Sequence, residues 1–196
     1  PTLGYGIKGV IWYQGESNSG GGDRYEELFP LMIQSWRLHW GIGDFPFYYV
    51  QIAPYKYDEY TKSQAIREAQ MMSLWVPNTG MAVTMDIGAE EDIHPKNKAD
   101  VGDRLARLAL AKTYGLEGID FSGPLYKAMK FDGNKIRITF DYVDGGLVAK
   151  EDQLTGFEIA GVNRKFIPAK AVVEGGMIVV SSDQIEHPMA VRYGWS

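Results

Sequence analysis

Three strongly apolar runs in the first half of the chain constrain its fold more than any other feature. Residues 10–13, 45–53 and 80–87 are rich in β-branched and aromatic side chains, which is typical of strands covered on both faces of a sheet. Segments with helical periodicity separate these runs, and strands that alternate with helices form parallel sheets covered by helices. The sequence therefore predicts an α/β fold with three parallel strands.

Each apolar run is followed by a segment with the pattern of an amphipathic helix. The first helix is expected to begin at Asp23, which forms a D-x-x-E capping pair with Glu26, and to end at Gly41. Pro30 lies inside this pattern and should kink the helix or shift its start. The third helix is expected at about 98–114. The apolar positions expected to mark the second and third helices are Ile66, Ala69, Met72, Val101, Leu105 and Leu108.

The sequence changes character near residue 118. After it come short alternating segments with tight turns between them, such as Asp-Gly-Asn at 132–134 and Gly-Gly at 175–176. Such turns between alternating segments predict β-hairpins. We therefore assign residues 1–118 to the α/β part and residues 119–196 to an antiparallel β module.

Composition excludes several classes of function. The net charge is −5 without a basic stripe, which argues against nucleic-acid binding, and no apolar run is long enough for a membrane span. The chain has no cysteine, so disulfides, thiolate catalysis and cysteine-ligated zinc are excluded. Its three histidines lack metal-site spacing and its Gly-rich loop lacks the P-loop lysine, so we expect neither a metal nor a cofactor.

Polar side chains follow each apolar run at the point where the strand should end. Because the carboxyl ends of parallel strands meet at one edge of the sheet, these side chains are expected to converge on a site. The polar residues at the three strand ends are Gln14, Glu16, Ser17, Asn18, Gln51, Asp86, Asp92 and His94.

His94 is the strongest candidate for chemistry within that set. Imidazole is the usual general base for a serine hydroxyl, and it needs a carboxylate to fix its tautomer. Asp92 lies two residues before His94 and Glu91 three residues before it, and in a loop either could reach the ring, so the spacing leaves both open. A surface loop without a catalytic role is the ordinary alternative for a D-x-H-P segment.

Ser17 is a second candidate because G-E-S-N-S approaches the G-x-S-x-G nucleophile elbow. An elbow turns straight into a helix, whereas Ser17 is followed by the flexible stretch Asn-Ser-Gly-Gly-Gly. We therefore expect Ser17 to hydrogen-bond within its loop, and we keep a Ser17-dependent hydrolase as an alternative.

Two blocks of this sequence carry a resemblance to a known family. GVIWYQGESN at 9–18, together with DIHPKNK at 92–98, closely resembles the sialate O-acetylesterase-like family of SGNH hydrolases, which are serine esterases on a flavodoxin-like α/β/α sheet. The segments GDFPFYYVQIA, VPNTGMAVT, SGPLYKAMK and AVRYGWS extend the resemblance over the whole chain. The resemblance implies that His94 is the base and that Asp92 orients it, with Glu91 as a rival. It also implies that Gln14, Gly15 and Glu16 form or support the oxyanion hole, with Asn18 beside them.

The family's nucleophile block, of the G-Q-S-N type, is not found among these residues. The resemblance therefore implies the C-terminal part of a carbohydrate O-acetylesterase, exported to the periplasm or secreted, whose serine lies in a missing N-terminal segment. We expect the isolated chain to be inactive on acetylated sugars. Strand 9–14 should present an unpaired edge that the missing segment or an oligomer partner covers. The alternative from another class is a non-catalytic carbohydrate-binding module on the same fold.

Overall fold

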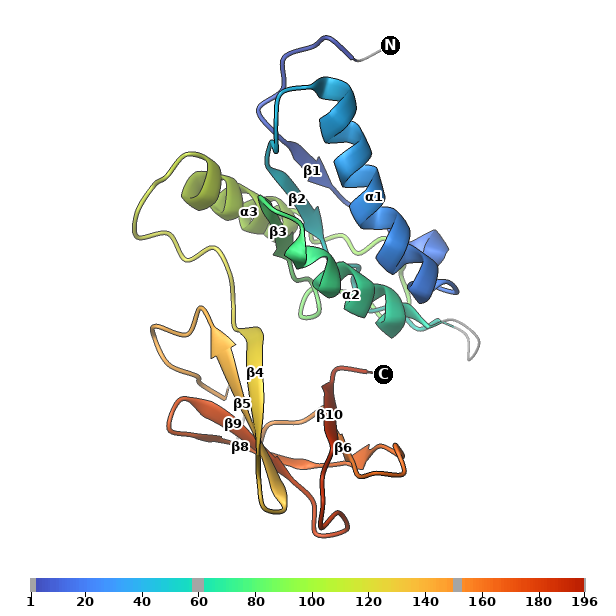
Figure 1. Ribbon diagram of the computed structural model, residues 1–196, viewed down its shortest axis with the longest axis vertical. Helices are drawn as coiled ribbons and strands as arrows, with labels where there is room; N and C mark the ends of the chain where they lie inside the picture. Colours follow the sequence, from blue (N-terminus) through green and yellow to red (C-terminus); the bar gives the residue numbers. More distant parts are fainter. Residues whose placement is uncertain (1–2, 58–61, 150–152, 196) are drawn as a thin grey trace. The chain divides into compact units, whose positions relative to one another are not determined.

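The computed structural model describes residues 3–57, 62–149 and 153–195. The chain divides into two units, Pro1–Ser122 and Gly123–Ser196 (Figure 1). The boundary lies slightly after the change of sequence character near residue 118. None of the helices in the described residues is long and apolar enough to cross a membrane.

The first unit is built on a parallel sheet with the strand order β1-β2-β3. These strands are β1 (Val10–Trp12), β2 (Phe47–Val50) and β3 (Thr79–Ala82), and both strand pairs are parallel. The predicted α/β fold is therefore confirmed. The order also places the three carboxyl ends along one edge of the sheet.

Helices cover this sheet on its two faces, because alternate residues of a strand point to opposite sides. α1 (Gly22–Trp40) and α2 (Ser63–Met72) share a core with Phe47 and Tyr49, whereas α3 (Lys98–Leu108) packs on Tyr48 and Val50 (Figure 1). Short helical turns complete the unit: η1 (Glu16–Asn18), η2 (Ser73–Trp75) and the π-helical η3 (Ala109–Thr113).

The structure corrects several details of the helices. Asp23 does not cap α1, because the helix begins one residue earlier and its N-cap, Gly21, makes no side-chain capping bond. Pro30 lies buried inside the helix, which continues through it. The helix ends as predicted at Gly41, in the left-handed region at φ 64°. In α2, the predicted core position Met72 is 49% exposed, and Gln70 is buried instead.

β1 is not covered on both faces, in contrast to the prediction from its apolar sequence. Val10 and Trp12 pack against the core formed with α1 and α2. Ile11 points to the other face and is 69% exposed, because the core under α3 is built on β2 and β3. Among the residues that the structure describes, β1 has a strand neighbour, β2, on one side only. This edge of the unit is therefore open and apolar.

The second unit is an antiparallel β module, as predicted. One sheet has the order β4 (Leu125–Asp132), β5 (Lys135–Asp141), β9 (Met177–Ser181) and β8 (Lys170–Glu174), and it contains both predicted hairpins. The other sheet has the order β10 (Ala190–Tyr193), β6 (Phe157–Ala160) and β7 (Ile167–Pro168). The core of this unit includes residues of both sheets: Ile136, Ile138, Phe157, Ile159 and Val180.

Candidate functional site

The segments that follow the three strands converge at the carboxyl edge of the parallel sheet. Lys98 Nζ lies 5.0 Å from the centre of the Tyr13 ring, which joins the start of α3 to the end of β1. The Lys56 N–H donates to the Glu90 carbonyl oxygen (2.9 Å), which joins the segments after β2 and β3. The convergence expected from the strand pattern is therefore present in the structure.

Gln14 forms the turn at the end of β1. Its Nε2 donates to Asn18 Oδ1 (2.6 Å), and the Tyr25 hydroxyl of α1 approaches both the Gln14 carbonyl oxygen (3.2 Å) and Oε1 (3.4 Å). These contacts orient the amide so that Nε2 faces Asn18. An amide Nε2 has two N–H donors, and the bond to Asn18 uses one of them.

Position 15 has no room for a side chain, so a glycine is needed there. Its backbone has φ 149°, which strains any L side chain, and a Cβ there would lie 2.8 Å from Ile52 Cγ2 and 3.1 Å from Gln70 Nε2. Glu16 follows in η1 and is partly buried. The tight approach of this turn to the segment after β2 thus depends on the absence of a side chain.

Gln70 is a site residue that the sequence analysis missed. It lies in α2 and is fully buried. Its Oε1 accepts from the Ile52 N–H (2.9 Å), while Nε2 donates to the carbonyl oxygens of Gln14 (3.1 Å) and Val50 (3.2 Å). One amide therefore holds the ends of β1 and β2 together. The signal that could have revealed it is its position four residues after Ile66, on the buried face of the helix.

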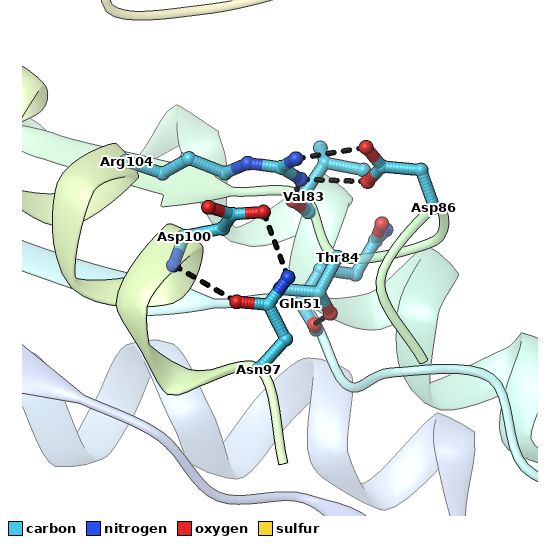
Figure 2. Close-up of polar contacts among 7 residues, drawn as sticks. All are labelled: Gln51, Val83, Thr84, Asp86, Asn97, Asp100 and Arg104. Carbon is cyan, nitrogen blue, oxygen red and sulfur yellow. Dashed lines mark hydrogen bonds and ion pairs between the residues drawn. The ribbon is translucent and has the colours of Figure 1, made fainter. Parts of the chain in front are cut away.

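Gln51 and Thr84 connect the ends of β2 and β3. The Thr84 hydroxyl donates to the Gln51 carbonyl oxygen (2.6 Å) (Figure 2). The Gln51 side chain donates to the Arg67 carbonyl oxygen (2.9 Å). Both side chains are buried. The polar residue that follows β2 therefore serves to fix the edge of the sheet.

His94 and the two candidate acids lie on the loop between β3 and α3. Asp92 Oδ1 accepts from the backbone N–H of His94 (2.9 Å), and the His94 side chain is exposed. Glu91 Oε1 lies 3.7 Å from Lys56 Nζ, and both of these side chains are largely in solvent. The structure thus places Asp92 beside the His94 backbone and Glu91 beside a lysine.

The tyrosines around this edge are held in their neutral form. Burial raises the pKa of Tyr13 and of Tyr57, and the negative charge of Glu16 raises both further. Burial also raises the pKa of Tyr25, which contacts Gln14. Neutral phenols are hydrogen-bond donors, so the site presents donors beside the partly buried carboxylates of Glu16 and Asp92.

Ser17 lies in η1 and is exposed. The α1 helix begins only at Gly22, so the backbone after Ser17 is not the strand-to-helix turn of a nucleophile elbow. Ser17 lines a cavity of about 460 Å³ together with Gln14, Arg24, Tyr25 and Met32. Among the residues that the structure describes, no group of three or more metal-ligating side chains is found.

Comparisons with known proteins agree on one family. Residues 2–111 match the family model described as carbohydrate esterase, sialic acid-specific acetylesterase. The sialate O-acetylesterase of Mus musculus is 31% identical over 97% of this chain and 40% of its own length, and that of Homo sapiens is 31% identical over 100% and 42%. The crystal structure of a novel carbohydrate acetylesterase from Xanthomonas citri superposes with a TM-score of 0.90 at 42% identity, over 100% of this chain and 47% of that one. The chain thus spans less than half the length of the proteins it matches.

Proposed function

This chain belongs to the carbohydrate esterase family of sialic acid-specific acetylesterases, and from that premise we propose that it forms part of a serine-type enzyme that removes acetyl groups from sugars. His94 acts as the general base. The nucleophilic serine comes from polypeptide outside residues 1–196. The relatives are more than twice as long as the part that this chain matches, so they leave room for such a segment.

The observation that supports this proposal is the convergence of Gln14 and the His94 loop at one edge of a parallel sheet. The contact between Lys98 and Tyr13 links the two segments directly. Both lie within residues 2–111, which are the residues matched by the family model. An esterase needs its base and its oxyanion donors around one ester carbonyl, and we assign these two tasks to side chains of the two linked segments.

The proposed reaction is acyl transfer in two steps. The serine oxygen bonds to the acetyl carbonyl carbon while its proton passes to the His94 imidazole, and the sugar oxygen leaves with that proton. Water then attacks the acyl-enzyme, His94 again takes the proton and returns it to the serine oxygen, and acetate is released. The remaining Nε2 donor of Gln14 stabilises the oxyanion in both steps. Loss of one such donor typically costs about 10²–10³ in rate.

Asp92 is the better placed of the two acids to orient the His94 ring. Its Oδ1 is already bonded to the His94 N–H, so its carboxylate stays near the histidine, and its second oxygen is the one we assign to the imidazole. Glu91 would have to leave Lys56, although an exposed ion pair of this kind is weak, about 0–1 kcal/mol. We therefore rank Asp92→Asn above Glu91→Gln as the more damaging substitution for turnover.

The open β1 edge is where we propose that the missing polypeptide, or a second copy of the chain, is bound. Its exposed Ile11 and its unpaired outer side favour addition of a strand. We expect light scattering of the purified 196-residue chain to detect an oligomer or a complex with a second polypeptide. A stable monomer at micromolar concentration would contradict this assignment.

The test of the function compares the complete gene product with the isolated chain. We expect the complete protein to hydrolyse an aryl acetate and an acetylated sugar, and the isolated chain to be inactive. His94→Ala should abolish turnover in the complete protein, whereas His187→Ala, in the β module, should leave it unchanged. Survival of activity in His94→Ala would refute the proposal.

Two further outcomes separate the alternatives. If the complete protein binds acetylated sugars without hydrolysing them, it is a carbohydrate-binding module on this fold. If the isolated chain is active and Ser17→Ala removes that activity, Ser17 is the nucleophile.

We also propose that the complete protein is exported from a bacterial cell, and detection of the protein only in the cytoplasmic fraction would refute that.

A further inference from the structure

The His94 loop spans residues 83–97, between β3 and α3, and contains neither helix nor strand. His94 and both candidate acids lie in its second half. A catalytic base must keep its position to within a fraction of an ångström, and a misplacement of about 1 Å can cost about 100-fold in rate. A loop of this length therefore needs anchors outside itself.

Arg104 anchors the beginning of the loop to α3. Its guanidinium donates from Nη1 to Asp86 Oδ1 (2.7 Å) and from Nη2 to Asp86 Oδ2 (2.8 Å) (Figure 2). Nη1 also donates to the carbonyl oxygen of Val83, the first residue after β3. A planar guanidinium that makes a two-pronged contact fixes direction as well as distance, which a lysine ammonium cannot do.

Asn97 anchors the other end of the loop to the same helix. The Asp100 N–H donates to Asn97 Oδ1 (3.2 Å), so Asn97 caps α3, and Asn97 Nδ2 donates to Asp100 Oδ2 (2.8 Å) (Figure 2). The middle of the loop is held by the hydrogen bond between Lys56 and Glu90 and by Gly88, where a Cβ would lie 2.5 Å from Pro54. The loop is therefore tied to the unit along its length.

α3 is a rigid support for these anchors. Its buried face, Val101, Leu105 and Leu108, packs on the sheet through Tyr48 and Val50. Arg104 follows Asp100 by four residues, so the anchors for the two ends of the loop stand one turn apart on the helix. Movement of α3 would shift both ends of the loop together.

We propose that Arg104 is a positioning residue for His94: its two-pronged contact with Asp86 and its bond to Val83 set the path of the loop that carries the base. The assignment rests on the proposed function of His94. Both partners are partly exposed, at 30% for Arg104 and 52% for Asp86, and partly exposed ion pairs contribute little to stability. The contact therefore acts on geometry more than on folding.

The structure provides a matched control on the same helix. Arg107 pairs with Asp103 through a 2.6 Å contact four residues away, entirely within α3. Arg107→Met removes the same charge and an arginine–aspartate ion pair that lies within the helix. Differences between Arg104→Met and Arg107→Met therefore report on the loop anchor itself.

The test uses the complete gene product with steady-state kinetics and NMR of the histidine rings. We expect Arg104→Met to lower kcat about 10–100-fold with KM within threefold, because the base is displaced while substrate binding is retained. Arg104→Lys should recover little of this loss, and Arg107→Met should behave like the native protein. The His94 ring signals should shift or broaden in Arg104→Met, while those of His39 and His187 stay unchanged.

Three outcomes would overturn the assignment. It fails if Arg104→Met keeps native kcat below its melting temperature, or if Arg107→Met loses as much activity. It also fails if Arg104→Lys restores native turnover, since a charge without the two-pronged geometry would then suffice. If His94→Ala is active, both the proposed function and the Arg104 role fail. If His94→Ala is inactive but Arg104→Met is active, only the Arg104 role fails.

Discussion

Replacing Gln70 with leucine is expected to destabilise the α/β unit by about 2–4 kcal/mol. The substitution removes the partner of three backbone groups: the Ile52 N–H and the carbonyl oxygens of Gln14 and Val50. A buried donor left unsatisfied costs about 1–3 kcal/mol. The carbonyls cost less, because each oxygen has two lone pairs and that of Gln14 also accepts from Tyr25. The apolar leucine offsets only part of this loss.

The effect can be measured by thermal unfolding followed through tryptophan fluorescence. Four of the five tryptophans lie in the first unit, so this signal reports mainly on it. For a unit of this size, each kcal/mol corresponds to about 3–5 °C, so the midpoint should fall by about 6–20 °C. Gln34→Leu, at an exposed position of α1, is the matched control and should shift the midpoint by less than about 2 °C.

A second variant at the same position tests the cause. Gln70→Glu puts a carboxyl group in a buried place that faces two carbonyl oxygens, so its pKa in the folded protein should rise above the unfolded value of about 4.3. The neutral acid can still donate to one carbonyl, whereas the carboxylate cannot. Stability present near pH 4 should therefore be lost as the pH rises through the folded pKa. Equal losses in Gln70→Leu and Gln34→Leu, or a Gln70→Glu deficit independent of pH, would refute the reasoning.

Two further predictions concern the stability of the same unit. Gly15→Ala should destabilise the unit by about 2–4 kcal/mol, measured by urea unfolding, because the new Cβ would collide with Ile52. Gly20→Ala is the control and should be nearly neutral, because its Cβ meets nothing within 4 Å. Equal effects of the two substitutions would contradict this. Burial raises the pKa of Tyr49 well above that of an unfolded tyrosine, so stability present below about pH 10 should be lost at higher pH. Tyr49→Phe should lessen that alkaline loss in melting experiments, and an unchanged slope would show that another group is responsible.

The α/β fold could be predicted because its signals are local. The apolar runs that became β2 and β3 are buried on both faces, and Gly41 ends α1 in the left-handed conformation that glycine favours. β1 has a similar composition but is half exposed. Composition indicates which segments form strands, whereas their coverage depends on the helices that pack on them, and the core shared with α1 and α2 covers one face of β1.

The candidate site could be predicted less completely. The strand pattern predicted that the Gln14 turn and the His94 loop leave the same edge of the sheet, because topology dictates where parallel strands end. The assignment of His94 itself stays a prediction. The direction in which a loop side chain points depends on backbone angles that no residue spacing encodes. Asp92 therefore bonds the His94 backbone N–H, a contact that the D-x-H pattern did not indicate. Gln70 was missed because the amphipathic pattern of α2 was interpreted only through its apolar residues.

The two halves of the site are held by helices on opposite faces of the sheet. Tyr25 of α1 and Gln70 of α2 fix the carbonyl group of Gln14, whereas Arg104 of α3 fixes the loop of His94. The distance between the proposed oxyanion donor and the proposed base therefore depends on how both helical layers pack on β2 and β3, not on a single loop. β2 and β3, on which both layers pack, are buried along their whole length. A rigid sheet is the common reference for the two groups that the proposed mechanism brings to one ester carbonyl.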